Sequence, residues 1–369
     1  MKIGIDCRLA GPTHAGIGRY SAELVSRLIA NKTHNWVLFF YDQTQAEMVL
    51  PQSAFEHKHV SITYAPIRHY TITEQLKLPG IFAAQKLDLL HVPHFNVPIF
   101  YSGCMVVTIH DLLWHDHRGT MVTTLPVWQY WIKYFFYRFV TRQAAKKATA
   151  IIVPAKTIQR TLARYYPNAS HKVSVITEGY SEVLVKAAAK LGKVARNKKQ
   201  LLYVGSLYPH KNIQLVLRAL QKLPNYTLQI VGARSVFLGQ TESLAQKLGV
   251  AQQVSFLCYV PDKRLAKLYK QSAALVQPSF SEGFGLTGIE ALALETPVLA
   301  STIPTFKEIY QNAALYFDPT DVDSFVAATQ SLSELSHHSF AKTAKQVVSQ
   351  YSWNDMAAET LAVYQKITH

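Results

Sequence analysis

Short hydrophobic runs alternate with longer stretches of helical periodicity along the whole chain. Each run is rich in β-branched or aromatic residues and ends at polar or glycine-containing turns, which is typical of buried parallel strands. Strands that alternate with helices predict α/β domains built on parallel sheets. The predicted strands are Lys2–Cys7, Trp36–Tyr41, Ser61–Ala65, Leu89–Val92, Met105–Ile109, Ala150–Val153, Leu201–Val204, Leu228–Val231, Val254–Leu257, Ala273–Val276, Pro297–Ala300 and Ala314–Phe317.

The alternation pauses after Glu178, where a Lys/Arg-rich stretch extends to residue 199. This stretch can be a solvated helix or a linker. The two series that it separates predict two doubly wound, Rossmann-like domains. We expect an N-terminal domain at 1–180, a basic linker at 181–199, a second domain at 200–350, and a C-terminal helix at 351–369 that can pack back on the first domain.

Size and composition restrict the class of protein. The chain has 369 residues, 49% of them hydrophobic, which suits two cores with a cleft between them. The N-terminus lacks the apolar core of a secretory signal, and no apolar run reaches the roughly 18 residues of a membrane span. The three cysteines, Cys7, Cys104 and Cys258, fit reduced thiols. We therefore expect a cytoplasmic protein whose membrane contact, if any, is peripheral.

The formal net charge of +15 indicates an anionic partner or surface. Such a charge attracts phosphates, nucleic acid and anionic lipid alike. The sequence has no zinc-finger spacing, no aromatic RNA-binding signature and no basic-region heptad. Nucleic acid is therefore not expected as the main ligand, which leaves a phosphate-rich small molecule and an anionic membrane.

Open parallel sheets bind ligands beyond the carboxyl ends of their strands, and the segment SEGFGLTGIEALAL occupies such a position after Val276. Its glycines allow close backbone approach, and a helix N-terminus carries about half a positive charge, which suits a diphosphate. Glu290 can accept from ribose hydroxyls and Glu282 from sugar hydroxyls. The alternative is a plain glycine turn before a helix. The candidate donor-binding residues of the turn are Gly283, Phe284, Gly285, Leu286 and Thr287.

This segment resembles the E-x7-E signature of the retaining glycosyltransferases of family 4. The resemblance continues through YVGSLYPHKN at 203–212, the LQIVG strand, VSFLCYVPDKRLAKLY, TFKEIY and ALYFDPTD. It implies the GT-B architecture, in which two Rossmann-like domains face each other across a donor cleft. It also implies a nucleoside-diphosphate sugar as donor, transfer with retention of anomeric configuration, and no metal or other cofactor.

Lys211 follows the strand that ends at Val204, and the resemblance places such a lysine on the donor phosphates. Asn212 can cap the next helix. Ser206 departs from the family, because many members carry an arginine directly after this glycine. His210 can supply part of the missing positive charge. The alternatives for that charge are Arg8, Arg19 and Arg234.

Two further candidates lie in the N-terminal half. GPTHAGIGRY follows the first strand and precedes a helix predicted to begin near Tyr20; within it, Gly16 and Gly18 are our choices for close approach to the donor. His110, at the end of another strand, can donate to a sugar hydroxyl. Asp111 can orient that histidine or cap the following helix.

The density of histidines around His110 suggests a competing hypothesis, a metal site. The sequence spacing of the candidate ligands argues against such a site, because no H-E-x-x-H motif occurs and neighbours on a strand point to opposite faces. The metal hypothesis is therefore not preferred. Its ligand set would come from His91, His94, His110, Asp111, His115, Asp116 and His117.

The acceptor is indicated less directly, by an aromatic and basic helix at 126–147. Such a helix suits an anionic bilayer surface, which would point to a lipid-linked glycan or a glycolipid as acceptor. The alternative is a core helix with solvated ends.

Contacts to the nucleobase are expected near Tyr259 and Val260. Glu295 is a second departure, because the family usually has glycine before Thr-Pro.

These features predict a retaining hexosyltransferase, with mannose as first choice, that acts in envelope or exopolysaccharide synthesis. Two other functions stay open. One is a catalytically inactive sugar-binding or scaffold protein, and the other is a sugar-nucleotide epimerase of the same fold.

Overall fold

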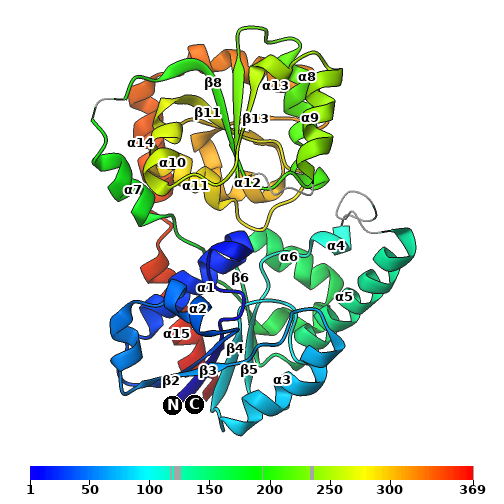
Figure 1. Cartoon of the computed structure of the whole chain (residues 1–369), viewed down its shortest axis with the longest axis vertical. Helices are drawn as coiled ribbons and strands as arrows, with labels where there is room; N and C mark the ends of the chain where they lie inside the picture. The colour runs from blue at the N-terminus through cyan, green and yellow to red at the C-terminus, as the bar shows by residue number, and fades with distance from the viewer. Residues whose placement is uncertain (117–118, 120–125, 193, 233–236, 369) are drawn as a thin grey trace. The chain divides into compact units, whose positions relative to one another are not determined.

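The computed structural model describes the chain except residues 117–118, 120–125, 193, 233–236 and 369. The chain divides into two compact units. Unit 1 comprises Met1–His115, Pro126–Glu178 and Ser352–His369, and unit 2 comprises Asp116–Leu125 and Gly179–Tyr351. Each unit is an α/β layer structure with a parallel sheet at its centre (Figure 1).

The sheet of unit 1 has seven parallel strands in the order β3-β2-β1-β4-β5-β6-β7. Ile3 and Ile5 of β1 and Val106 and Val107 of β5 are fully buried, as expected for a sheet covered on both faces. The strands are β1 Lys2–Asp6, β2 Asn35–Phe40, β3 Val60–Tyr64, β4 Leu89–Val92, β5 Met105–Thr108, β6 Ala150–Val153 and β7 Val173–Val175.

The α-helices of unit 1 are α1 Ala15–Leu28, α2 Gln43–Val49, α3 Ile72–Ala84, α4 Leu113–Asp116, α5 Val127–Lys147, α6 Lys156–Tyr165 and α15 Trp353–Thr368. The last of these, α15, contacts α1 and β6 (Figure 1). Trp353 packs edge-on against Tyr20 at 6.4 Å between ring centroids, and the Tyr364 hydroxyl contacts Nδ1 of His91. The end of the chain therefore completes the core of unit 1.

The sheet of unit 2 has six parallel strands in the order β10-β9-β8-β11-β12-β13. Its strands are β8 Asn197–Val204, β9 Thr227–Val231, β10 Val254–Leu257, β11 Ser272–Gln277, β12 Val298–Ser301 and β13 Ala314–Phe317. Its helices are α7 Glu182–Ala189, α8 Ile213–Leu220, α9 Leu238–Lys247, α10 Asp262–Gln271, α11 Leu286–Ala293, α12 Pro304–Tyr310, α13 Val322–Gln330 and α14 His337–Val348.

The strand order reverses between β1 and β4 in unit 1 and between β8 and β11 in unit 2. In open α/β sheets, ligands bind beyond the carboxyl ends of the strands at such switch points. The predicted site residues follow these strands or their neighbours. The fold therefore gives each unit one edge at which they gather.

The predicted two-sheet α/β fold is confirmed, and each predicted strand overlaps an observed one. Strand β7, which has three residues and lies at the edge of its sheet, was not predicted. The predicted start of the first helix near Tyr20 was wrong, because α1 begins at Ala15. The segment 181–199 holds α7, which packs against α10, and the first residues of β8.

Helix α5 matches the predicted aromatic helix in its position but is neither fully covered nor fully exposed. Tyr130, Tyr134 and Tyr137 are buried on one face, whereas Trp128 and Phe135 are about two-thirds exposed on another. Among the described residues, none of the helices combines the length and the hydrophobicity that crossing a membrane requires.

Glu295, the departure from glycine, lies just past α11 in the left-handed conformation with φ of 56°. Its N–H donates to the carbonyl of Leu292, and the N–H of Thr296 donates to the carbonyl of Ala291. These two bonds form a Schellman motif, whose left-handed position favours glycine. A glycine would adopt this backbone conformation with less strain than Glu295 does.

Candidate functional site

An ion pair joins Lys211 and Glu282 at the switch point of unit 2. Lys211 ends the short 3₁₀ turn Pro209–Lys211 after β8, and Glu282 lies in the turn between β11 and α11. The Lys211 Nζ is 2.7 Å from Oε2 of Glu282. The Ser279 hydroxyl donates to the other carboxylate oxygen, Oε1, at 2.7 Å. Two residues that are 71 positions apart in the sequence thus form one ion pair.

The surroundings of Glu282 keep it ionised. Burial alone would raise the pKa of its carboxyl group, but the charge of Lys211 and the hydrogen bonds from Lys211 and Ser279 outweigh burial and hold the pKa below its ordinary value. Both side chains keep some exposure, 22% for Lys211 and 16% for Glu282. An ammonium group has three donors, so Lys211 can hold Glu282 and still meet a phosphate oxygen.

Asn212 fixes the loop that carries Lys211. It lies at the N-cap position of α8 with φ of 55°, a conformation that Asn tolerates better than most residues. Its side chain makes no cap hydrogen bond. Its amide instead donates to the carbonyls of Pro278 at 3.0 Å and Pro319 at 2.8 Å. The predicted capping role was therefore wrong, and the side chain ties the loop after β8 to the loop after β11.

The turn before α11 is shaped by a glycine that no other residue can replace easily. Gly285 has φ of 99°, and a Cβ atom built there would lie 2.1 Å from the Tyr310 hydroxyl oxygen. That hydroxyl donates to the carbonyl of Gly285 at 2.7 Å. Gly285 is the N-cap of α11, so the first amides of the helix, at Leu286 and Thr287, lie outside the helical ladder.

The neighbours of Gly285 have different surroundings. Phe284 is buried and packs edge-on against Tyr351 with 5.4 Å between ring centroids. The Thr287 hydroxyl accepts from the Gln277 amide at 2.7 Å. Gly283 lies next to Glu282 in the partly exposed turn. The structure therefore brings Lys211, Glu282 and the N-terminus of α11 together at one strand edge.

Glu290 lies one helical turn further along α11. It is only 2% exposed, and its carboxylate accepts from the Tyr269 hydroxyl at 3.3 Å. The two glutamates of the E-x7-E pattern therefore have different surroundings, since Glu282 pairs with a lysine and Glu290 with a tyrosine.

The other predicted residues of unit 2 are spread more widely. His210 is buried beside Glu282, and its positive form would help to lower the pKa of that carboxyl. Ser206 is half-buried, and its carbonyl accepts from the Tyr203 hydroxyl at 2.5 Å. Tyr259, beyond the end of β10, is 82% exposed. Arg234, one alternative for the missing arginine, lies outside the described residues.

His110 lies at the carboxyl end of β5 in unit 1, and both of its ring nitrogens have acceptors. Nδ1 is 3.0 Å from Oε1 of Glu178, and Nε2 is 3.2 Å from the carbonyl oxygen of Pro93. The ring of Tyr20 packs edge-on against the imidazole at 4.6 Å. The ring is therefore held in one orientation. The neighbouring Asp111 accepts from the Leu113 N–H and so caps the short helix α4.

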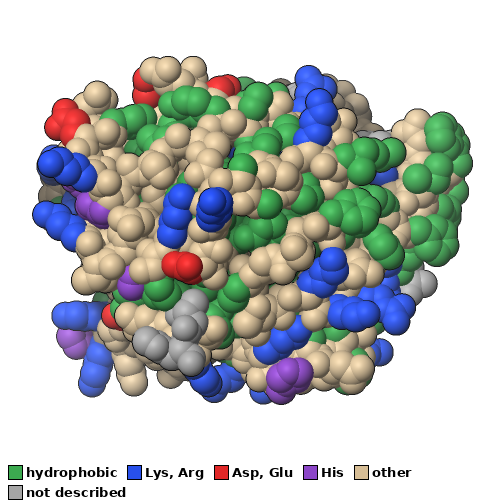
Figure 2. All heavy atoms as spheres, turned by 90° about the horizontal axis from the view of Figure 1, so that it is seen from below, with side chains coloured by type: hydrophobic (Ala, Val, Ile, Leu, Met, Phe, Trp, Pro, Cys, Tyr) green, Lys and Arg blue, Asp and Glu red, His purple; other side chains and the backbone are tan. Residues whose placement is uncertain are grey.

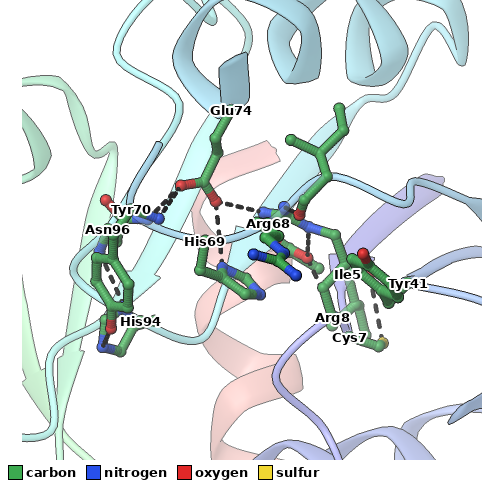
Figure 3. A network of polar contacts seen from close by, with 12 residues as sticks. Ile5, Cys7, Arg8, Tyr41, Arg68, His69, Tyr70, Glu74, His94 and Asn96 are labelled. Atoms are coloured by element: carbon green, nitrogen blue, oxygen red, sulfur yellow. Dashed lines mark hydrogen bonds and ion pairs between the residues drawn. The ribbon is translucent and has the colours of Figure 1, made fainter. Parts of the chain in front are cut away.

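Arg8 cannot act as a phosphate clamp, because its guanidinium is buried and paired with carboxylates within unit 1. It donates to Asp6 at 2.8 Å and to Glu74 at 2.9 Å, and it is only 2% exposed. Glu74 also receives His69 and the Asn96 amide (Figure 3). The network joins the end of β1 to the start of α3. The alternative in which Arg8 replaces the missing arginine was therefore wrong.

The two glycines chosen in the first loop lie in the first turn of α1. A Cβ atom on Gly18 would come within 2.0 Å of the carbonyl oxygen of Gly11, whose own N–H bonds to the Gly18 carbonyl at 3.0 Å. Gly18 therefore serves the close approach of two segments of its own chain. Gly16 is exposed at the start of the helix.

The histidines of the metal hypothesis form hydrogen bonds of their own. Burial, together with the charge of His110, lowers the pKa of His91 to about 3, and its nitrogens contact Tyr364 and Thr108. His115 bonds the hydroxyls of Tyr137 and Tyr166, each at 2.7 Å. His117 lies outside the described residues. In the described part of the chain, His, Cys, Asp and Glu side chains do not gather in threes as metal ligands would.

Sequence reasoning missed Glu178 and Tyr310. Glu178 is 68 residues from His110, and Tyr310 is 25 residues from Gly285. Neither belongs to a local motif. The only signal for Glu178 is a single acidic residue just after an apolar run, which is common in loops.

Comparison with known proteins found two family models that match the chain. The model described as "Glycosyltransferase Family 4" matches residues 14–182, and the model described as "Glycosyl transferases group 1" matches residues 186–347. The O-antigen chain mannosyltransferase RfbU of Salmonella typhimurium is 26% identical over 337 residues, covering 88% of this chain and 89% of the relative. The O-antigen chain mannosyltransferase B of Escherichia coli is 29% identical over 376 residues, covering 95% and 96%.

The fold also matches solved structures. Sucrose-phosphate synthase from Thermosynechococcus elongatus superposes with a TM-score of 0.76 at 17% identity, covering 100% of this chain and 99% of that one. At this identity the likeness shows the fold alone. With the family 4 model on the first half and the group 1 model on the second, the chain belongs to the glycosyltransferases of the family 4 type, which have the two-domain GT-B fold.

Proposed function

We propose that this glycosyltransferase moves a hexose, with mannose as first choice, from a nucleoside-diphosphate sugar to a glycan or lipid-linked acceptor in envelope or exopolysaccharide synthesis. The relatives of nearly full length are named O-antigen chain mannosyltransferases, which supports both the sugar and the type of polymer. The observation that carries the proposal is the Lys211–Glu282 pair beside the N-terminus of α11.

The donor diphosphate needs positive charge where its leaving group gathers negative charge. Lys211 supplies a full charge, and the first amides of α11 supply partial charges that suit phosphate oxygens. Glu282 is ionised and accepts hydroxyls of the sugar, while Glu290 accepts hydroxyls of the ribose. In this assignment Lys211 and the N-terminus of α11 stabilise the negative charge of the leaving diphosphate, and Glu282 orients the sugar.

The contribution of unit 1 is His110. Its Nε2, which meets the carbonyl oxygen of Pro93 in the structure, donates instead to a hydroxyl of the sugar when the donor is bound. We propose retention by attack of the acceptor on the same face from which the diphosphate leaves. The leaving phosphate oxygen takes the acceptor proton, so the step needs no covalent intermediate. It also needs no metal ion, so a chelator should leave transfer unchanged. NMR assignment of the anomeric configuration tests the mechanism, and an inverted product would refute it.

Donor identity is tested by thermal shift with GDP-mannose, UDP-glucose and ADP-glucose, because a ligand of the native state raises the melting temperature. Transfer is then measured with the donor that binds. Product formation that requires a separate acceptor separates a transferase from an epimerase, and turnover separates it from an inactive sugar-binding protein. No shift with any of the nucleotide sugars would count against the proposal.

We further propose that the enzyme works at the cytoplasmic face of a membrane. This follows from the lipid-linked acceptor and from the net charge of +15.

A further inference from the structure

Helix α5 of unit 1 exposes an unusual amount of apolar surface. Monomeric soluble proteins rarely expose large contiguous apolar patches, and those that they do expose are often functional. Figure 2 shows hydrophobic side chains gathered toward the right edge of the view, where α5 lies in Figure 1, with Lys and Arg side chains near them. The exposed large side chains of α5 are 40–70% accessible: Val127, Trp128, Trp131, Ile132, Phe135 and Phe139.

The order of side chains along this face is what specifies a partner. Trp128, Ile132, Phe135 and Phe139 are spaced by three or four residues and so share one side of the helix. The same spacing continues to Arg142 and Lys146, which are exposed. The face is therefore aromatic and aliphatic along its first part and basic along its last. We call it the α5 outer face, defined as Trp128, Trp131, Ile132, Phe135, Phe139, Arg142 and Lys146.

The charged side chains of α5 and of the neighbouring helix α6 are all basic. The 21 residues of α5 contain five Lys or Arg residues and no Asp or Glu. Helix α6, also free of acidic residues, exposes Lys156, Arg160 and Arg164. The guanidinium groups of Arg138 and Arg164 lie 5.4 and 5.7 Å from the centre of the Tyr165 ring, which brings the basic residues of α5 and α6 together.

We propose that the α5 outer face docks on a bilayer that contains anionic lipid, with its aromatic part in the interfacial region and its basic part against the headgroups. Tryptophan prefers the membrane interface, and Lys and Arg are attracted to anionic headgroups. A second copy of the chain would instead bring two basic surfaces together. This inference rests on the proposed lipid-linked acceptor and names the surface that brings unit 1 to it.

The first experiment measures binding of the full chain to vesicles of phosphatidylcholine, alone or mixed with phosphatidylglycerol. Binding to the anionic vesicles is expected at about 50 mM salt and should weaken strongly at about 500 mM, where charges are screened. The tryptophan emission should shift to the blue on binding. Trp36 and Trp353 are already buried, and Trp114 is half-buried against Tyr130 and Tyr137. The shift therefore reports mainly on the exposed Trp128 and Trp131.

Variants separate the two parts of the face. Arg142→Gln with Lys146→Gln should weaken vesicle binding about thirtyfold, roughly fivefold for each charge. Trp128→Ser with Phe135→Ser should weaken binding at least about tenfold and reduce the blue shift, to which Trp131 then contributes without Trp128. Lys342→Gln with Lys345→Gln removes the same charge from exposed positions of α14 and is the matched control. Met48→Ser, at a side chain 64% exposed on α2, is the apolar control.

The proposal is supported if both face variants lose vesicle binding while both controls keep it. It is overturned if the unmodified protein fails to bind anionic vesicles at low salt, or if the face variants bind as well as the controls. Dimerisation that the aromatic variant abolishes, without vesicle binding, would assign the face to a second copy instead. Donor thermal shifts and transfer to a water-soluble acceptor need no vesicles, so their failure would refute the proposed function and not this surface.

Discussion

The imidazole of His110 and the carboxylate of Glu178 are 3.0 Å apart, although one ends a strand and the other lies beyond the last strand of the same sheet. With Pro93 on its other nitrogen, His110 has a single ring orientation. A carboxylate in this place acts on the reaction through the histidine. Glu178 is therefore a positioning residue for whatever hydroxyl His110 meets.

Glu178→Gln should lower kcat about a hundredfold, because a small displacement of a reacting group has that order of effect. KM for the donor should change little, since the residues assigned to the donor phosphates belong to unit 2. Steady-state kinetics with both substrates measures the two constants. Glu178→Asp should recover part of kcat, and Glu182→Gln, on an exposed glutamate of α7, is the control. A wild-type kcat in Glu178→Gln would refute the positioning role.

Lys211→Ala should reduce transfer by about a hundredfold or more through loss of transition-state stabilisation. It should also destabilise unit 2 by about 1–3 kcal/mol, because Glu282 then loses the cation that offsets its burial. Urea unfolding measures the second effect. Adding Glu282→Gln to Lys211→Ala should restore stability without restoring activity.

Lys222→Ala provides the matched control for that experiment. Lys222 pairs with Asp323 at the surface of the same unit, with side chains 53% and 71% exposed. Exposed pairs contribute roughly 0–1 kcal/mol, so neither stability nor transfer should change much. If the Lys211 double variant were active, the assignment of Lys211 to the diphosphate would fail.

The stabilising contribution of Glu282 should depend on pH. Its pKa in the folded protein is below its ordinary value, so the unfolded chain binds the proton more tightly. The contribution is complete above the ordinary glutamate pKa of about 4.3 and is lost as pH falls through the folded value. The stability difference between the wild type and Glu282→Gln should therefore shrink below about pH 4. A difference that stays constant from neutral to acid pH would contradict the lowered pKa.

Glu295→Gly should stabilise unit 2 by about 1 kcal/mol, because it removes a side chain from a left-handed position. A second helix of the same unit, α9, ends in the same motif with a glycine in the left-handed position. Gly249 ends α9 with φ of 72° and the same pair of hydrogen bonds, from Gly249 to Gln246 and from Val250 to Ala245. Gly249→Ala should therefore destabilise by a similar amount. Thermal melting of both variants tests the pair, and shifts of the same sign would contradict the conformational argument.

The fold could be predicted from sequence because the sheets consist of short apolar runs that are separated by turn signals. Strands such as Leu89–Val92 and Val254–Leu257 have the same bounds in the prediction and in the structure. Strand β7 escaped because it is short, half-buried and interrupted by Ser174. The start of α1 was not predicted because its glycines resemble a loop, whereas the small size of Gly18 allows close packing against Gly11.

The candidate site could be predicted only where its residues form a local motif. Glu282 and the N-terminus of α11 follow from one segment, and Lys211 from another. The tie from Asn212 to two prolines and the bond from Glu178 to His110 join distant segments, which no local pattern records. The sequence also could not predict which face of α5 is exposed, because aromatic residues occur all around that helix.

Helix α15 has a consequence for the order in which the protein can be completed during synthesis. Unit 2 is contained within Gly179–Tyr351 apart from a short earlier segment, whereas unit 1 needs Trp353–Thr368 to cover Tyr20 and His91. The ribosome releases α15 only after the main segment of unit 2. Unit 1 therefore cannot close its core until unit 2 has been synthesised, and its apolar surface near α1 stays uncovered until then.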